Sequence, residues 1–362
     1  MKLGIISLGG PGGELVKEEA SKYFDEVKWI NIKNVDVRAT TAGLRVSYNG
    51  EELKNYDCLF MRGSYKYEML QTSITLALEN KVYMPLHYTA FKVCHNKLST
   101  LMVLQKAGLP VPTTYFAATT EQAKMILEEV NYPIILKIPE GTHGKGVMFA
   151  DSLPSAKSML DALEVFKQPY IIQEYIESGS TDVRAFVVNG EVVASMRRRA
   201  ASDDIRSNIH MGGVGEKYKL SFDAEQIAIK AAKAIKAEIC GVDLLEGSRT
   251  VIIEVNASPG FKGITAASGK NVAAIVAKGL YEKTLEFKKS QNNNAYKDML
   301  DEFKLGERKQ KQFLTTLNVR AGIIKLPSIV TQITGFKDEE DVLIKSDKGK
   351  LSVTGYRIKK EG

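Results

Sequence analysis

The chain has 362 residues, of which 44% are hydrophobic, and it carries a net charge of +7. This length is enough for two or three domains with their own cores. No apolar run approaches the length of a membrane span, and Met1–Ser7 leads into a glycine-rich turn, which predicts a first β-strand and not a signal peptide. The three cysteines are scattered and form no CxxC pair, so we expect a cytoplasmic protein with no zinc site. The positive charge favours anionic ligands such as nucleotides.

The N-terminal part alternates strands with a helix. The expected elements are Lys2–Leu8, Glu14–Phe24, Val27–Ile32 and Tyr56–Met61, of which the second is the helix. This alternation predicts an α/β domain with a parallel sheet over residues 1–95. The turn Gly9–Gly13 does not fit the pattern GxGxxG, and the second strand lacks the acidic residue that would hold a ribose. These departures argue against dinucleotide binding.

Beyond residue 95 the pattern changes to α+β, with more antiparallel pairing. Helices are expected at Asn96–Ala107, Ser155–Leu163 and Ala224–Ala237, and strands at Tyr132–Ile138, Met148–Ala150, Tyr170–Ile176, Thr181–Val188 and Glu191–Arg197, with a hairpin around Glu246–Thr250. A glycine and a proline follow the first of these helices in the order expected of stop signals. A helix to about Lys289 precedes Ser290–Asn294, a polar run that indicates a linker.

The predicted hairpin carries two acidic residues that face each other. Glu254 and Asn256 are two apart in a β-branched apolar run, so they point to one face of a strand. If Gly247 pairs with Thr250 across the turn, the same register sets Asp243 opposite Glu254. Like charges ~4.5–5.5 Å apart destabilise a sheet unless something neutralises them, and oxygen ligands favour Mg²⁺ or Mn²⁺. The sequence therefore predicts a metal site, although an exposed hairpin with screened charges is an alternative.

Two lysines are candidates for phosphate contacts. Lys137 closes an apolar strand beside the glycine-rich loop Gly141–Gly146, and Lys97 opens a helix. A lysine beside flexible backbone N–H groups suits phosphate oxygens, but strand-end lysines also commonly extend to water without a function. The loop is not a Walker A sequence, because no Lys-Ser/Thr follows its last glycine.

Arginines gather in the next predicted strands. Asp182 and Arg184 are i and i+2 on one strand, so a carboxylate and a guanidinium share a face. Three arginines, Arg197–Arg199, end the following strand, and a solvated edge is the common explanation for such a run. The segment Ile205–Gly213 interleaves arginine with serine, asparagine and glycine, which favours an anion-binding loop.

These motifs occur in the order found in ATP-grasp enzymes, and they look most like the RimK-type α-L-glutamate ligases. The motifs are Lys137–Val147, Gln173–Ile176, Asp182–Arg184, Ile205–Gly213, Gly241–Asp243 and Glu254–Gly260. The resemblance covers about residues 1–285. It implies an N-terminal pre-ATP-grasp α/β domain at 1–95 and a two-lobed ATP-grasp fold at 96–289, with lobes of about 96–175 and 176–289.

The resemblance also implies residue roles. Arg184 and Arg198 would be catalytic and would clamp the phosphoryl group or the acceptor carboxylate. Two Mg²⁺ (or Mn²⁺) ions would be held by Asp243, Glu254 and Asn256. ATP would be bound by Lys97, Lys137, Gly144, Lys145, Glu174, Tyr175, Ile176, Asp182, Arg206, Ser207 and Asn208. Of these, the backbone of Glu174–Ile176 would hold the adenine, Asp182 the ribose and the lysines the phosphates. Asn96 departs from the family, where an aspartate often precedes the lysine.

The implied reaction joins a carboxylate to an amine. The carboxylate would attack the γ-phosphoryl group of ATP to give an acylphosphate, and the α-amino group of an amino acid, expected to be glutamate, would then form the amide. The acceptor is left open between a protein tail, a small coenzyme or metabolite, and an acceptor bound to a carrier protein. A ligase for another amino acid and a nucleotide-binding regulator are the alternatives.

A small β-rich module is expected at 314–362, after a linker or helix at 290–313. Its predicted elements are strands at Leu317–Arg320, Ile323–Pro327, Asp341–Lys345 and Lys350–Thr354, with a helix at Ser328–Thr334. The module resembles AbrB-like swapped-hairpin domains, which implies pairing with a second copy and hence a homo-oligomer. DNA contact through it, which the interleaved charges do not support, and docking of a protein substrate are the alternatives, and no membrane partner is expected.

Overall fold

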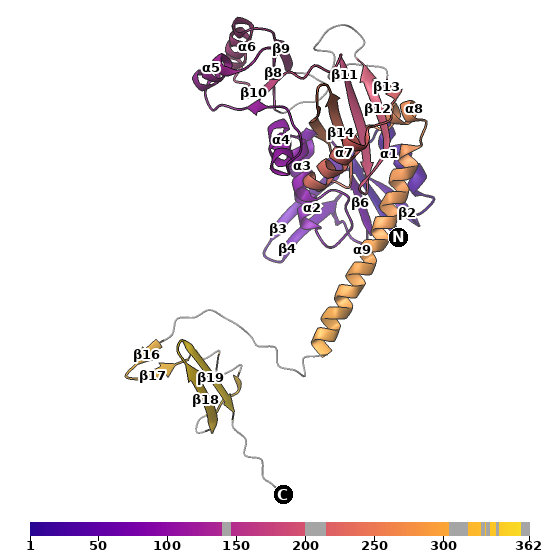
Figure 1. Cartoon of the computed structure of the whole chain (residues 1–362). Helices are drawn as coiled ribbons and strands as arrows, with labels where there is room; N and C mark the ends of the chain where they lie inside the picture. Colours follow the sequence, from indigo (N-terminus) through magenta and orange to yellow (C-terminus); the bar gives the residue numbers. More distant parts are fainter. Residues whose placement is uncertain are drawn as a thin grey trace. The chain divides into compact units, whose positions relative to one another are not determined.

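The computed structural model (Figure 1) describes residues 1–139, 146–199, 215–303, 318–326, 330, 334–337 and 340–355. Met1–Ala295 form one compact unit, and Tyr296–Gly362 form a second. Within the described ranges, no helix is both long and apolar enough to cross a membrane.

The chain opens with the parallel sheet that the sequence predicts, in the order β2-β1-β6. Its elements are β1 (Lys2–Ser7), α1 (Pro11–Ala20), β2 (Glu26–Asn31) and β6 (Cys58–Met61). Alternate residues of β1 enter two different cores: Leu3 and Ile5 pack in one, and Ile6 packs in the other. Both faces of β1 are therefore buried, which explains its continuous apolar run.

Several elements before residue 97 have no counterpart in the sequence prediction. They are β3 (Val35–Thr40), β4 (Gly43–Tyr48), β5 (Glu51–Glu52), α2 (Glu68–Ala77) and α3 (Tyr88–Cys94). The three strands form an antiparallel sheet of their own. Only a few of their side chains are buried, so the sheet lacks the apolar alternation from which strands are recognised.

The part of the chain from β7 to β10, called the outer lobe below, is an antiparallel sheet covered on one face by two helices (Figure 1). Its strands are β7 (Thr114–Tyr115), β8 (Ile134–Lys137), β9 (Val147–Ala150) and β10 (Ile171–Glu174), and its helices are α5 (Thr120–Glu129) and α6 (Leu153–Val165). Ile134, Leu136 and Ile172 pack against the helices. Because side chains alternate along a strand, Lys137 and Gln173 point to the opposite face of this sheet.

A five-stranded antiparallel sheet of order β13-β12-β11-β14-β15 forms the centre of the first unit. Its elements are β11 (Thr181–Val188), β12 (Glu191–Arg199), β13 (Gly215–Lys217), β14 (Ile239–Glu246) and β15 (Thr250–Asn256), with α4 (Lys97–Lys106), α7 (Phe222–Ile235) and α8 (Lys262–Ser268) around them. Alanines of α7 pack with Val183 and Val242 on one face. Asp182, Arg184 and Asp243 alternate with these residues and point away from α7.

The helix α9 (Val272–Phe303) continues through the polar run Ser290–Asn294, so of the two alternatives expected there, linker or helix, the structure has helix as far as Phe303. Neither glycine nor proline occurs in α9 after Gly279, and asparagine costs a helix well under about 1 kcal/mol per residue. Gln291 donates a hydrogen bond to the carbonyl of Asn80 at 2.9 Å. This part of α9 is therefore held to the N-terminal elements.

The described part of the second unit contains two hairpins. They are formed by β16 (Asn318–Arg320) with β17 (Ile323–Lys325) and by β18 (Val342–Asp347) with β19 (Lys350–Gly355). Both hairpins were expected from the sequence, whereas most of the predicted helix Ser328–Thr334 lies outside the described residues. The strands leave large apolar side chains exposed, among them Ile323 at 69% and Ile344 at 59%.

Candidate active site

The hairpin β14–β15 brings Asp243 opposite Glu254, as predicted, but by a different register. At the turn, Glu246 pairs with Thr250, so the expected pairing of Gly247 with Thr250 is wrong. A β-bulge after Asp243 places one extra residue on β15 and restores the predicted partner. Glu254 and Asn256 share a face with Asp243, which is the arrangement that the metal-site prediction requires.

A chain of alternating charges lies across the central sheet. Arg184 donates two hydrogen bonds to Asp243, at 2.7 and 2.6 Å, and Arg198 donates two to Asp182, at 2.7 and 2.6 Å. Arg198 also lies 2.9 Å from Asp243 and so joins the two pairs. Both carboxylates are almost fully buried, with 1% of the Asp182 side chain and none of the Asp243 side chain exposed. Burial disfavours the charge of Arg198, but Asp243 and Asp182 together raise its pKa.

These ion pairs affect two predicted roles, that of Asp182 in binding ribose and that of Asp243 in binding metal. Both oxygens of Asp182 accept from Arg198, so its contact with a ribose stays a prediction. Asp243 lies behind the cavity wall, whereas Glu254 and Asn256 line the cavity. The described residues contain no group of three or more His, Cys, Asp or Glu side chains that could hold a metal ion. The candidate ligands are instead the carboxylates of Asp243 and Glu254 and the amide of Asn256. Their oxygens fit Mg²⁺ if Asp243 gives up its hydrogen bonds from an arginine and binds the ion.

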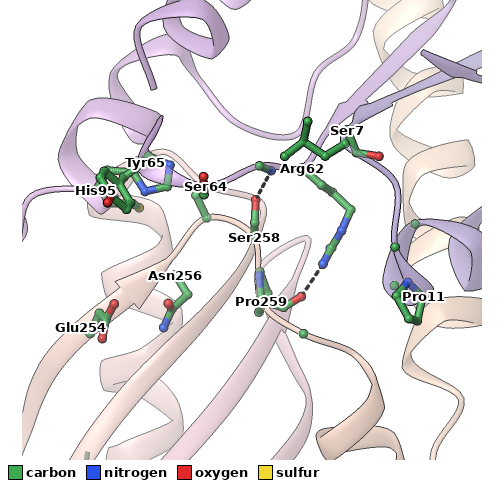
Figure 2. A pocket seen from close by; sticks show the side chains of 18 of the residues that line it. Ser7, Pro11, Arg62, Ser64, Tyr65, His95, Glu254, Asn256, Ser258 and Pro259 are labelled. Atoms are coloured by element: carbon green, nitrogen blue, oxygen red, sulfur yellow. Dashed lines mark hydrogen bonds between the residues drawn. The ribbon is translucent and has the colours of Figure 1, made fainter. Parts of the chain in front are cut away.

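The cavity has a volume of 510 Å³, within the usual size of small-molecule sites. Its wall combines the predicted residues Lys97, Arg184, Glu254 and Asn256 with N-terminal segments and the loop after β15, whose residues have no role predicted from the sequence. The unassigned lining is Ser7–Gly13, Arg62–Tyr65, Cys94, His95 and Ala257–Gly260. Figure 2 shows this meeting of the two parts, with Glu254 and Asn256 on one side and Ser7 and Pro11 on the other. The glycine cluster after the first strand is the one sequence signal that could have indicated this wall.

Lys137 is a buried lysine at the end of β8. It lies on the face of the outer lobe's sheet that α5 and α6 do not cover. Its ammonium group donates to Oε1 of Gln173 at 2.6 Å, and Gln173 donates in turn to Oγ1 of Thr114 at 2.8 Å. Burial, with the nearby charge of Lys97, lowers the pKa of Lys137 to about 8. The side chain is 7% exposed, so it does not extend to water as a snorkelling lysine would.

Lys97 is placed by the start of α4. Asn96 caps this helix by accepting a hydrogen bond from the backbone N–H of Ser99 at 2.9 Å. Asparagine caps a helix about as well as aspartate, so the departure from the family motif keeps the local geometry. Burial lowers the pKa of Lys97, and the charge of Glu254 opposes this shift. Lys97 therefore stands near both Glu254 and Lys137.

Replacing Lys137 with methionine should stabilise the fold at pH 7 and weaken nucleotide binding. The pKa of the lysine falls from 10.5 to about 8, and this difference corresponds to roughly 3 kcal/mol against the charged form. Loss of the bond to Gln173 offsets about 1 kcal/mol of the gain. Because the pKa of Lys137 is lower in the folded state than in the unfolded state, the charged lysine destabilises the fold fully below pH 8. This destabilisation disappears as the pH rises towards 10.5.

Urea unfolding at pH 7 and at pH 9.5, with calorimetric titration of ADP, measures both effects. The stability advantage of Lys137→Met should shrink at the higher pH, and the exposed Lys106→Met serves as the matched control. If Lys137→Met has the same stability as the wild type at pH 7 and binds ADP equally well, the assignment of Lys137 to phosphate is contradicted.

The segment assigned to adenine follows β10. Oε1 of Glu174 accepts a hydrogen bond from the N–H of Thr113 at 2.9 Å and also bonds Arg249. The ring of Tyr175 packs edge-on against Phe149, with centroids 5.3 Å apart. These contacts fix the strand end, while the adenine contact itself stays a prediction for Glu174, Tyr175 and Ile176.

Five predicted ATP-binding residues, Gly144, Lys145, Arg206, Ser207 and Asn208, lie outside the described residues. Their assigned roles stay predictions. The structure thus brings together Lys97, Arg184, Glu254 and Asn256 on one cavity, with Arg198 and Asp243 directly behind it.

Comparison with known families and proteins gives consistent matches. A family model described as a RimK-like ATP-grasp domain matches residues 94–280. A protein of Thioalkalivibrio sulfidiphilus (strain HL-EbGR7), named probable alpha-L-glutamate ligase, is 36% identical over 279 residues, covering 75% of this chain and 93% of that protein. A protein of the same name from Aliivibrio salmonicida (strain LFI1238) is 33% identical over 282 residues, covering 76% and 94%.

Solved structures show the same fold at lower identity. The ATP-grasp ligase PsnB, complexed with a phosphomimetic variant of a minimal precursor, Mg and ADP, aligns with a TM-score of 0.61 at 18% identity, covering 78% of this chain and 98% of that one. D-alanine–D-alanine ligase from Bacillus anthracis, complexed with ATP, aligns with a TM-score of 0.57 at 16% identity, covering 80% and 99%. The motif order, the cavity and these matches agree, and the chain belongs to the family defined by the RimK-like ATP-grasp domain.

Proposed function

We propose that the protein is an ATP- and Mg²⁺-dependent ligase that joins the α-amino group of glutamate to a carboxylate. The observation that carries this proposal is the 510 Å³ cavity, where Lys97, Arg184, Glu254 and Asn256 meet the N-terminal glycine-rich turn. Relatives that are 33–36% identical and named probable alpha-L-glutamate ligase support the choice of amino acid. An ATP-dependent ligase is the activity that the family and the fold have in common.

The cationic residues account for the first step. An acceptor carboxylate attacks the γ-phosphoryl group of ATP, and negative charge develops on the transferred oxygens. Lys97 and Lys137 neutralise this charge from the nucleotide side, while Arg184 and Arg198 hold the phosphoryl group or the carboxylate at the central sheet. Their burial strengthens each contact, because the local dielectric is low.

Oxygen ligands at the same end of the cavity suit the metal. Glu254, Asn256 and Asp243 would hold it, and one or two Mg²⁺ ions would supply charge neutralisation for the phosphates. The acylphosphate then reacts with the amine of glutamate, with phosphate as the leaving group. No side-chain nucleophile is needed, which agrees with the burial of Cys58, Cys94 and Cys240.

Release of ADP that depends on an amino acid tests the proposal. The full-length protein is incubated with ATP, Mg²⁺, a cell extract as the source of acceptor and one amino acid at a time. L-Glutamate should stimulate ADP release, and one product should gain the mass of a glutamate residue. Release with a different amino acid would replace glutamate in the proposal, and nucleotide binding without any product would favour a regulator.

Removing the second unit should leave the chemistry intact and change assembly. Every residue assigned to ATP or metal precedes Ala295, where the first compact unit ends. The exposed Val319, Ile323 and Ile344 in the second unit support pairing with another copy, because small hairpins bury little surface alone.

A chain that ends at Ala295 should therefore elute from a sizing column as a smaller assembly, with glutamate-dependent ADP release within about twofold of the full-length rate. An unchanged assembly would remove the second unit as the oligomerisation element. Loss of catalysis with a small acceptor would place that unit in the active site.

A further inference from the structure

At the N-terminal end of the cavity, Arg62 has a guanidinium group with no acidic partner among the described residues. It follows β6 and lines the cavity together with Gly12 and Pro259. In the described part of the chain Arg62 forms no ion pair, whereas Arg184, the other arginine in the described lining, is paired with Asp243. The two cavity arginines therefore differ within the described residues: Arg184 is paired with Asp243, and Arg62 has no such partner there.

Arg62 is nevertheless held in a fixed position. Its Nη2 donates to the carbonyl of Pro259 at 2.8 Å, and its Cζ lies 4.3 Å from the centre of the Phe261 ring. Nη1 is buried and has no hydrogen-bond acceptor among the described residues. Burial lowers the pKa of Arg62 to about 10, so the group stays charged at neutral pH. A desolvated cation without a counter-ion is unfavourable, and an anion beside it would remove that cost.

The first turn of α1 lies against the same guanidinium. A Cβ on Gly12 would stand 3.2 Å from Nη2 of Arg62 and 3.0 Å from the Phe261 ring, so a side chain here would require these neighbours to shift by a few tenths of an ångström. Gly10 precedes the helix and provides no side-chain cap. Pro11 has no N–H and the N–H of Gly13 donates to the carbonyl of Gly10 at 3.0 Å, so the helix end would act on an anion through its dipole and the N–H of Gly12. Two separate sources of positive potential, the arginine and the helix end, thus meet on one wall.

Figure 2 separates this wall from the residues of the reaction. Arg62 extends towards Pro259, with Pro11 beyond it, whereas Glu254 and Asn256 lie on another side of the cavity. A substrate that fills the space reaches from Glu254 to Arg62. None of the described lining residues at the Arg62 end is acidic, and Glu14 in the first turn of α1 is exposed and does not line the cavity.

We propose that Arg62, with the first turn of α1, binds the side-chain carboxylate of the amino-acid substrate, which does not react, and so selects for an acidic amine substrate. The inference rests on the proposed function, and it identifies the group that orients the amine of the amino-acid substrate. With this carboxylate held on Arg62, the amine points back towards the acylphosphate carbon at the Glu254 end. Arg62 is then a specificity-determining residue supplied by the N-terminal domain.

A purely structural role for Arg62 has its own support and must be separated from the proposal. The bond from Arg62 to Pro259, and the bond from the N–H of Gly63 to Oγ of Ser258 at 3.1 Å, join the N-terminal domain to the loop after β15. If this attachment were the whole role of Arg62, its substitution would lower the stability of the fold and weaken the binding of every amino acid equally.

Calorimetric titration of the full-length protein, with ADP and Mg²⁺ present, distinguishes the two. The ligands are L-glutamate, L-glutamine and the α-amide of L-glutamate, in which one carboxylate at a time is uncharged. The wild type should bind glutamate at least tenfold more tightly than L-glutamine, in which the side-chain carboxylate is replaced by an amide. Arg62→Gln should lose about 10- to 100-fold in glutamate affinity and no longer discriminate against that amide, because a charge-assisted bond is removed. Arg62→Lys should retain part of the discrimination.

The controls keep the result specific. Arg38→Gln makes the same change on an exposed β3 arginine and should leave all three affinities unchanged. ADP affinity in Arg62→Gln should equal that of the wild type. Equal weakening of all three ligands, or unaltered discrimination, would overturn the assignment of Arg62 while wild-type glutamate-dependent ADP release upholds the proposed function. Absence of that release in the wild type would contradict the proposed function itself.

Discussion

Glu254→Gln should lower the rate of glutamate-dependent ADP release by about a thousandfold or more. The substitution keeps the size of the side chain and removes one anionic oxygen ligand. Loss of that ligand withdraws several kcal/mol of transition-state stabilisation, because charge on the phosphoryl group is then poorly neutralised. Asn256, which shares its face, is neutral and would not replace the lost charge.

Nucleotide affinity in Glu254→Gln should stay within a few-fold of the wild type, because the adenine contacts are assigned to the distant end of β10. Initial rates over a range of Mg²⁺ concentrations, with ADP titration, measure both quantities. Glu191→Gln, an exposed change at the start of β12, is the matched control. Normal turnover of the Glu254 variant at low Mg²⁺ would remove the metal assignment.

Arg198→Met should have the largest effect on stability, about 3–5 kcal/mol of unfolding free energy. Arg198 supplies both hydrogen bonds of the buried Asp182 and one contact to Asp243. Methionine leaves the Asp182 carboxylate without that partner in a site where 1% of the side chain is exposed. An unpaired buried carboxylate costs far more than the loss of an exposed pair.

Urea unfolding of the two variants Arg198→Met and Arg199→Met checks this expectation. Arg199 is the exposed neighbour at the end of β12, and its substitution should change stability by less than about 0.5 kcal/mol. Adding Asp182→Asn to Arg198→Met should restore part of the loss, because the buried charge is removed as well. If the Arg198 and Arg199 variants unfold alike, the pair with Asp182 contributes little to the fold.

The sequence predicts which residues share a face better than it predicts their partners. The alternation in β11 and β15 correctly groups Asp182 with Arg184 and Glu254 with Asn256. The pairings Asp182–Arg198 and Arg184–Asp243 depend on how β12 and β14 align with β11, which the local sequence does not determine. The bulge beside Asp243 has the same origin, since only the packed hairpin selects it.

Long-range contacts account for the other omissions. Arg62 and the turn Gly9–Gly13 reach the site because β1 and β6 end beside the loop after β15, almost two hundred residues later in the chain. In α9 the polar run Ser290–Asn294 has the composition of a linker, but contacts such as that of Gln291 with Asn80 retain it as helix. Tertiary contacts override local composition in both places.

The turn of the β14–β15 hairpin also touches the segment that joins the lobes. A Cβ on Gly247 would stand 2.4 Å from the carbonyl oxygen of Glu177, and Arg249 bonds Glu174 at the end of β10. These contacts attach the turn of the central sheet to the end of β10, whose residue Ile171 pairs with Lys137 on β8. The position of Lys137 relative to the β14–β15 hairpin therefore depends on the turn, and a substitution at Gly247 should disturb that position.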